Sequence, residues 1–191
     1  MAISDKEVLA AYERTGGVLK GHFLLTSGRH SDTYMQSAKL FVRPDEAEKI
    51  AEALADKLKS YKPDIVVAPA VGGIILGYEL ARKLGISDIF AERENGQMTL
   101  RRGFALEKGQ RVVVAEDVVT TGGSVKEVIA LCQSLGANVV ACASVVDRSN
   151  GKVAFDVPYV PLLSMEVQSW EAGECPLCKA GSAPYKPGSR T

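Results

Sequence analysis

Apolar runs of strand length, each ending in a polar or glycine-rich turn, recur along the middle of the chain. They occupy residues 63–73 (PDIVVAPAVGG), 111–119 (RVVVAEDVV) and 138–148 (NVVACASVVDR). Helical periodicity follows the first two runs, at residues 73–85 and 122–136, and Ile50, Leu54 and Leu58 share one face of a helix expected over 45–60. Strands that are apolar on both faces and alternate with helices predict an α/β fold with a central parallel sheet flanked by helices.

The length of the chain and its uneven composition indicate one core with two additions. Its 191 residues suit a single well-buried domain. We expect residues 1–44 to form a small N-terminal hood and residues 45–157 to form the core. Residues 158–191, which contain five of the eight prolines, are expected to form a C-terminal tail that packs near the hood.

The charge of the chain is balanced, with 23 Lys and Arg residues against 23 Asp and Glu residues. This balance gives no global reason to bind nucleic acid or an anionic membrane. No apolar run approaches the roughly 20 residues that cross a bilayer, and the first 25 residues contain charged side chains where a signal peptide has an apolar core. We therefore expect a cytoplasmic protein with a small-molecule partner.

The stretch VVVAEDVVTTGGSV, residues 112–125, places acidic, hydroxyl and glycine residues directly after an apolar strand. In a parallel sheet, ligands gather at the carboxyl ends of strands, where the next loop presents backbone N–H groups at a helix N-terminus. The glycines and hydroxyls of residues 120–124 suit a phosphate cradle at that place. The motifs GxxxxGK[ST] and GxGxxG are absent, which weakens nucleotide triphosphate and NAD interpretations.

Two carboxylates, Glu116 and Asp117, directly precede this cradle. Acids repel phosphate, so we interpret them as acceptors for the vicinal hydroxyls of a ribose, which can also hold Mg²⁺ through water. A ribose 5-phosphate then fits the whole stretch. The alternative is a strand end with two solvated acids and an ordinary turn.

Three segments together resemble the orotate phosphoribosyltransferases. Residues 112–124 (VVVAEDVVTTGGS) are similar to the phosphoribosyl-pyrophosphate signature of type I phosphoribosyltransferases. Residues 21–34 (GHFLLTSGRHSDTY) and 144–151 (SVVDRSNG) resemble the two stretches that distinguish the orotate family. The resemblance implies the type I phosphoribosyltransferase fold, phosphoribosyl pyrophosphate and orotate as substrates, orotidine 5′-monophosphate and pyrophosphate as products, and Mg²⁺ as cofactor.

The resemblance also implies residue roles. Glu116 and Asp117 would hold the ribose hydroxyls, and Thr120, Tyr34 and Arg148 would contact orotate. The guanidinium of Arg148 suits a planar anion, although a surface arginine is the alternative. Phosphoribosyl pyrophosphate would be bound by Val118, Val119, Thr120, Thr121, Gly122, Gly123 and Ser124.

Two further segments match mobile or tight loops of the family. Residues 91–104 (AERENGQMTLRRGF) offer Arg93, Arg101 and Arg102 as a lid that reaches the neighbouring subunit's site, which implies a homodimer. A plain surface hairpin is the alternative, above all for Arg101 and Arg102. Residues 68–74 (APAVGGI) match the loop that meets pyrophosphate, where Gly72 and Gly73 permit a tight backbone, or serve only as a strand-to-helix turn.

Several positions depart from well-studied members of the family. Thr26 and Gly72 stand where those members have lysine, and Tyr34 and Met35 stand where paired aromatic residues flank the base. Two other functions therefore remain open. One is transfer to a different base, and the other is a non-catalytic regulator that senses phosphoribosyl pyrophosphate and binds nucleic acid.

The cysteines fall into two pairs. Cys132 and Cys142 lie in apolar runs and are interpreted as core residues. Cys175 and Cys178 form a CPLC in the tail, but a structural zinc normally takes four ligands and no second CxxC or HxxxH is present. A dangling thiol pair is the interpretation preferred here, with a zinc site or a disulfide as alternatives. His22 and His30 receive no role.

Overall fold

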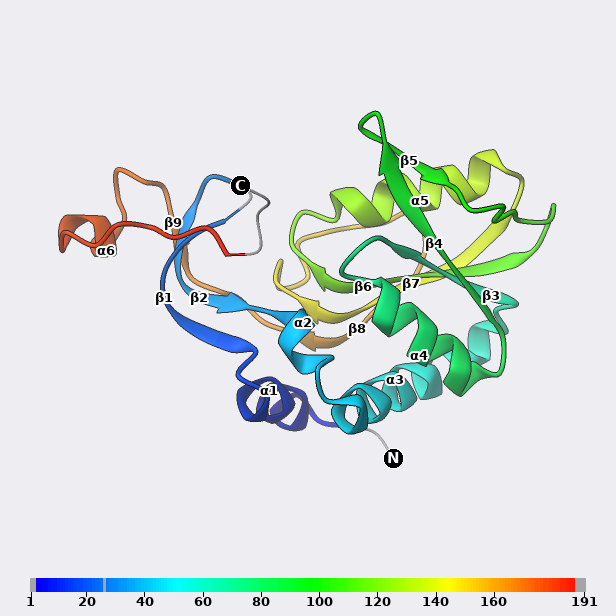
Figure 1. Cartoon of the computed structure of the whole chain (residues 1–191), viewed down its shortest axis with the longest axis horizontal. Helices are drawn as coiled ribbons and strands as arrows, with labels where there is room; N and C mark the ends of the chain where they lie inside the picture. Colours follow the sequence, from blue (N-terminus) through cyan, green and yellow to red (C-terminus); the bar gives the residue numbers. More distant parts are fainter. Residues whose placement is uncertain (1–2, 26, 188–191) are drawn as a thin grey trace.

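The computed structural model describes residues 3–25 and 27–187, which form two sheets (Figure 1). The larger sheet has six strands in the order β5-β4-β3-β6-β7-β8. Its strands are β3 (Ile65–Pro69), β4 (Ser87–Glu94), β5 (Gln97–Leu100), β6 (Arg111–Val119), β7 (Asn138–Asp147) and β8 (Tyr159–Ser164). All neighbouring strands in it are parallel except β4 and β5, which form an antiparallel hairpin. The predicted α/β fold is confirmed, with β5 as an antiparallel edge.

Helices cover both faces of this sheet (Figure 1). On one face lie α3 (Pro44–Leu58), which continues into the 3-10 turn Lys59–Tyr61, and α4 (Ile74–Leu84). Proline occupies the first turn of α3, and its Ile50, Leu54 and Leu58 are fully buried, as their spacing predicts. On the other face lies α5 (Gly123–Ser134), which buries Val125, Val128, Ile129 and Cys132 against the strands.

The hood contains α1 (Asp5–Arg14), β1 (Val18–Leu24), β2 (His30–Met35) and α2 (Ser37–Leu40). Strands β1 and β2 pair antiparallel, and β9 (Ser169–Trp170) from the tail adds to β2 as a third strand. In Figure 1 this three-stranded sheet stands beside the core, to its left. Its α1 packs toward the core through Val8 and Tyr12, which are fully buried.

The segment expected as a tail divides into two parts in the structure. Strand β8 belongs to the core sheet, where it pairs with β7. Residues beyond β8 run along the hood as β9 and the short helix α6 (Pro176–Lys179), and backbone hydrogen bonds join Tyr185 to His22 and Leu24, each at 2.8 Å. The Cys175 side chain is fully buried, and His22 and His30 are 7% and 6% exposed, so the preferred interpretation of a dangling thiol pair is wrong.

No helix among the described residues combines the length and the apolar character needed to span a bilayer.

Candidate active site

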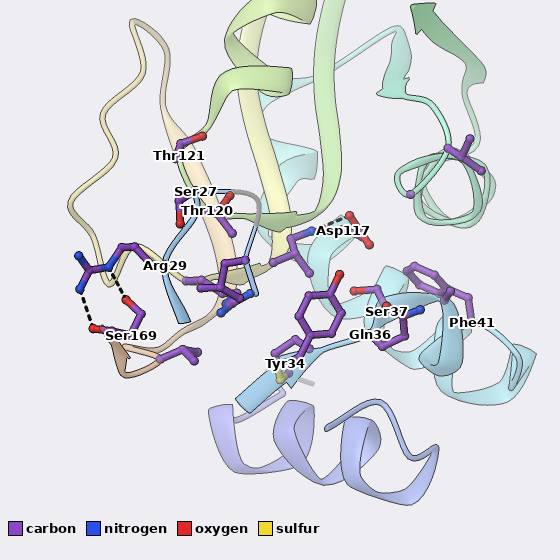
Figure 2. A pocket seen from close by; sticks show the side chains of 18 of the residues that line it. Ser27, Arg29, Tyr34, Gln36, Ser37, Phe41, Asp117, Thr120, Thr121 and Ser169 are labelled. Carbon is purple, nitrogen blue, oxygen red and sulfur yellow. Dashed lines mark hydrogen bonds between the residues drawn. The ribbon is translucent and has the colours of Figure 1, made fainter. Parts of the chain in front are cut away.

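The carboxyl ends of β3, β6 and β7 open into two adjoining cavities. The large cavity, of about 650 Å³, lies between this edge of the sheet and the hood. The small cavity, of about 320 Å³, lies between the end of β6, the start of α5 and Arg93. Both are lined by Val118, Thr120 and Thr121, so one extended ligand can occupy the two together. Figure 2 shows Tyr34, Asp117 and Thr120 around the large cavity.

The two predicted carboxylates lie at the end of β6, one at each cavity. Asp117 lines the large cavity and Glu116 lines the small one. The backbone N–H of Val118 donates to Asp117 Oδ1 at 2.8 Å, and that of Asp117 donates to Glu116 Oε1 at 3.1 Å. Burial, with the nearby Asp117 carboxylate, raises the pKa of Glu116 well above its usual value. The pair thus offers acceptor oxygens to a polyol at the boundary between the cavities.

The predicted phosphate cradle connects β6 to α5 and lines the small cavity. Gly122 is the N-cap of α5 and has φ +75°, the left-handed region that glycine tolerates best. No side chain caps this helix N-terminus. The first N–H groups of a helix lack partners within it, so those of residues 123–124 are available to an anion together with the Thr121 hydroxyl.

Arg93 is the cation that the structure brings to the small cavity. It projects from β4, and its guanidinium pairs with Glu127 of α5 at 2.7 Å while Nη1 donates to the Gly96 carbonyl at 2.9 Å. Arg101 and Arg102 line neither cavity. They pair instead with Glu94 at 3.4 Å and with Glu92 at 2.8 Å on the same hairpin.

Arg148 lines the large cavity from the loop after β7. Its Nε is buried and has no hydrogen-bond partner among the described residues, and its guanidinium carbon lies 6.0 Å from the centre of the Tyr34 ring. Burial lowers the pKa of Arg148. The neighbouring Asp147 fixes this loop, since it accepts hydrogen bonds from Ser149 N at 2.8 Å and Gly151 N at 2.9 Å. A half-buried cation that lines a cavity beside an aromatic ring is suited to a planar anion.

Gly72 of the 68–74 loop lines the large cavity, and the peptide between Ala70 and Val71 in this loop is cis. A Cβ on Gly72 would lie 2.9 Å from Asp117 Oδ1, and a Cβ on Gly73 would lie 2.9 Å from the Ala115 carbonyl oxygen. Both positions therefore hold the loop close to β6, beside the carboxylates.

The hood supplies residues to the large cavity that sequence reasoning did not single out. Arg29 lines it and donates from Nε to Ser169 Oγ at 2.9 Å and from Nη2 to the Ser169 carbonyl at 2.6 Å. Gln36 and Ser37 line it at the end of β2. Arg29 belongs to the 21–34 stretch that resembles the orotate family, whereas nothing in the sequence marks Ser169. Thr26 lies outside the described residues.

Comparisons with known proteins place this chain in a family. The model of the phosphoribosyl transferase domain matches residues 38–177. Orotate phosphoribosyltransferases of Caldanaerobacter subterraneus subsp. tengcongensis and Thermoanaerobacter sp. are 53% and 55% identical to the chain over 188 residues, with 98% of this chain and 99% of each relative covered.

Solved structures agree. The crystal structure of orotate phosphoribosyltransferase from Aeropyrum pernix superposes with a TM-score of 0.71 at 26% identity, covering 83% of this chain and 93% of that one. The order and connection of the strands are thus those of the type I phosphoribosyltransferase fold. The chain belongs to the orotate phosphoribosyltransferases.

Proposed function

We propose that the two cavities together transfer the 5-phosphoribosyl group of phosphoribosyl pyrophosphate to orotate, giving orotidine 5′-monophosphate and pyrophosphate in pyrimidine biosynthesis. One arrangement carries the proposal: the carboxylates of Glu116 and Asp117 stand between an uncapped helix N-terminus and the half-buried guanidinium of Arg148, which lines the large cavity. A ribose with a phosphate at one end and an anionic base at the other matches these three features in order.

The 5′-phosphate is assigned to the small cavity. There it receives N–H groups from the start of α5, hydroxyls of Thr121 and Ser124, and the positive end of the helix dipole. Arg93 adds a positive charge at the rim. The ribose hydroxyls donate to Glu116 and Asp117, which fixes the sugar across the boundary between the two cavities.

Orotate is assigned to the large cavity. The guanidinium of Arg148 donates to its oxygens, and the Tyr34 ring, which lies beside that guanidinium, supports the plane of the base. Thr120 contacts it from the end of β6. Because Met35 stands where a second aromatic residue is usual in well-studied relatives, one face of the base meets an adaptable thioether instead of a ring.

Carboxylate oxygens that face a cavity at a strand end fit the hard-cation preference of Mg²⁺. Glu116 and Asp117 would hold it, directly or through water, and when bound it would neutralise charge on the pyrophosphate. The residues of the chain position the two substrates. In the reaction the bond between C1′ and the pyrophosphate oxygen breaks, a bond forms between C1′ and a ring nitrogen of orotate, and the proton of that nitrogen is released to solvent. Positive charge develops on the sugar, and the Asp117 carboxylate beside it stabilises that charge.

The proposal includes a homodimer. Arg101 and Arg102 are paired on their own hairpin and do not reach either cavity of their own subunit. Exposed apolar side chains support a contact with a second copy, since Val71, Ile75 and Tyr78 are 71%, 47% and 61% exposed along the start of α4. A partner hairpin placed over the site would bring these arginines to the pyrophosphate.

A spectrophotometric assay tests the proposal by following orotate absorbance with phosphoribosyl pyrophosphate and Mg²⁺. We expect Asp117→Asn to lower kcat by about 100-fold or more, because a charge beside the reacting sugar is lost. Arg148→Ala is expected to raise the KM for orotate by about 10- to 100-fold, while Lys152→Ala, which removes an exposed cation from the same loop, changes neither value. Turnover of adenine, hypoxanthine or uracil without turnover of orotate would reject the base assignment, and unchanged rates in both site variants would reject the site.

A further inference from the structure

Four side chains with metal-binding atoms converge in the hood, away from the two cavities. They are His22 of β1, His30 of β2, and Cys175 and Cys178 at α6. One ligand atom from each lies within 4.8 Å of all the others, and the first three residues are buried. Cys175 and Cys178 have the C-x-x-C spacing that places two sulfurs on one side of a turn, which is a common half of a zinc site.

The distances between these atoms are those of a small tetrahedron. His22 Nε2 and His30 Nδ1 are 2.9 Å apart, His22 Nε2 lies 3.4 Å from Cys175 Sγ and 3.7 Å from Cys178 Sγ, and His30 Nδ1 lies 3.2 Å from Cys178 Sγ. With usual zinc bond lengths, the edges of a tetrahedral site are about 3.3 Å between nitrogens and about 3.6 Å between nitrogen and sulfur. The four atoms are thus arranged around a space of the size that one zinc ion fills.

The protonation of His22 supports a cation at the centre. Its Nδ1 lies 3.0 Å from the Ser182 carbonyl oxygen, which only accepts, so Nδ1 carries the proton and Nε2 presents a lone pair. Three atoms, His30 Nδ1 and the two cysteine sulfurs, lie within 3.7 Å of His22 Nε2, which has only one lone pair to share among them. A metal ion satisfies all of them at once. The contact from Nδ1 to a backbone carbonyl is also the usual way in which a ligating histidine is oriented.

The segment that carries the cysteines lacks an apolar core of its own. Among residues 166–187, only Cys175 and Pro187 are buried, and none belongs to either hydrophobic cluster of the protein. So little buried area does not hold a segment of this length in one conformation, and a metal is a common substitute for a core in small units.

We propose that His22, His30, Cys175 and Cys178 bind one structural Zn²⁺ that fastens the C-terminal segment to the hood. Two thiolates neutralise the charge of the ion, which suits a buried place, and four protein ligands leave no open position for a substrate. The site also bears on catalysis indirectly. His30 adjoins Arg29, and its β9 partner strand carries Ser169, so the ion holds the Arg29–Ser169 contact at the wall of the large cavity.

Metal analysis of the full chain tests this directly. The protein is purified under reducing conditions without a metal-affinity tag, and bound metals are measured by plasma mass spectrometry. We expect about one zinc per chain. Replacing the ion with Co²⁺ should give the visible ligand-field bands of tetrahedral coordination and a thiolate-to-cobalt charge-transfer band, which report the ligands without any substitution.

Matched variants assign the ligands. Cys178→Ala should lower zinc content by about tenfold or more, whereas Cys178→His, which keeps a fourth ligand, should retain it. Cys132→Ala removes a buried thiol of the core and should leave zinc content unchanged. Stripping zinc with a chelator should make the segment after residue 165 sensitive to limited proteolysis while the core stays resistant, and zinc addition should reverse this.

Three results would overturn the proposal: wild-type protein that takes up neither zinc nor cobalt, a Cys175–Cys178 disulfide found by mass spectrometry in protein kept in a reducing buffer, or full zinc content in Cys178→Ala. Because these readouts do not depend on turnover, they stand apart from the test of the proposed reaction. A chelator also removes Mg²⁺, so the activity of the zinc-free protein is measured after Mg²⁺ has been added back. Any remaining loss of activity then comes from the loss of zinc.

Discussion

At the scale of single residues, Asp88 is a carboxylate whose surroundings disfavour its charged form. It lies near the start of β4, its Oδ1 is buried without a hydrogen-bond partner, and Gly77 of α4 faces it so closely that a Cβ there would lie 2.8 Å from Oδ1. Burial raises the pKa of Asp88 to about 7 from 3.8. The folded state therefore binds a proton more tightly than the unfolded state, and stability is lost as pH rises from about 4 to about 7.

Asp88→Asn should remove this loss. We expect the free energy of unfolding at pH 8 to rise by about 1–2 kcal/mol, a value reduced from the full pKa shift because the side chain is only half-buried. At pH 4 the gain should disappear, since Asp88 is then protonated in the folded protein. Urea unfolding at pH 4 and pH 8, at one protein concentration, measures this change in the free energy of unfolding. Asp156→Asn, at an exposed position, is the control. A gain that is the same at both pH values would contradict the assignment.

Gly73 is a second position where one residue decides a local structure. A Cβ there would lie 2.9 Å from the Ala115 carbonyl oxygen and 3.0 Å from that of Pro69, and backbone atoms of two central strands have no room to move. Gly73→Ala should therefore lower the free energy of unfolding by about 1–3 kcal/mol. Gly173→Ala, which meets nothing within 4 Å, is the control in denaturant unfolding. Equal free energies of unfolding for the two variants would show that the loop moves enough to accommodate the Cβ.

At the scale of elements, the connection from β6 to α5 is the part on which phosphate binding depends. Gly122 has φ +75°, and a Cβ there would lie 2.8 Å from Val153 Cγ1 and 2.9 Å from the Phe155 ring. Gly122→Ala should displace the start of α5 and weaken binding of phosphoribosyl pyrophosphate by about tenfold or more in calorimetric titration. Stability should fall as well, whereas Gly123→Ala, whose Cβ would meet only Thr121 Oγ1 at 3.8 Å, should leave stability nearly unchanged. Binding at wild-type strength would place the phosphate elsewhere.

The helices and strands that the sequence predicted are those with a regular pattern of apolar residues. Strand β6, helix α3 and helix α5 all follow from uninterrupted apolar patterns with clear end signals. Strand β8 lies in the proline-rich segment expected as a tail, and it contains Pro161. The structure explains this tolerance, since β8 is the edge strand of the sheet and proline needs no partner on the outer side. The reversal between β4 and β5 falls at Asn95 and Gly96, which both have positive φ, so an Asn-Gly pair marks this hairpin in the sequence.

At the scale of the whole molecule, the sequence located residues of the site that lie in one stretch and missed those that meet only through the fold. Glu116, Asp117 and the cradle are consecutive, so their common place at a strand end follows from the pattern. Ser169 reaches the large cavity only because β9 pairs with β2. His22 and Cys175 are separated by 153 positions, and no spacing rule joins a strand pair to a distant CxxC. Such contacts come from topology, which local periodicity does not encode.

At the same scale, the surface through which the proposed homodimer forms can be tested. The apolar side chains of Val71, Ile75 and Tyr78 are exposed around the start of α4, and the first two also line the large cavity. In Figure 1 the hairpin of β4 and β5 projects beyond the sheet on the side of α5, away from α4. The proposed dimer would form through α4, bury this exposed surface and place each hairpin near the partner's site. Tyr78→Asp should therefore give monomers in sedimentation experiments, whereas Leu135→Asp, also at an exposed apolar position, should not.

Mixing two inactive variants tests whether the hairpin acts across that dimer. One variant carries Asp117→Asn with an intact hairpin, and the other carries Arg101→Ala and Arg102→Ala with intact carboxylates. If the hairpin serves the partner's site, a mixed dimer contains one site with both parts intact, and random exchange of subunits should restore about a quarter of the wild-type rate. If the hairpin serves its own subunit, every site in the mixture lacks one part and the rate stays at that of the parents. Unimpaired turnover by the Arg101→Ala and Arg102→Ala variant alone would instead show that these two arginines belong to a surface hairpin with no part in the reaction.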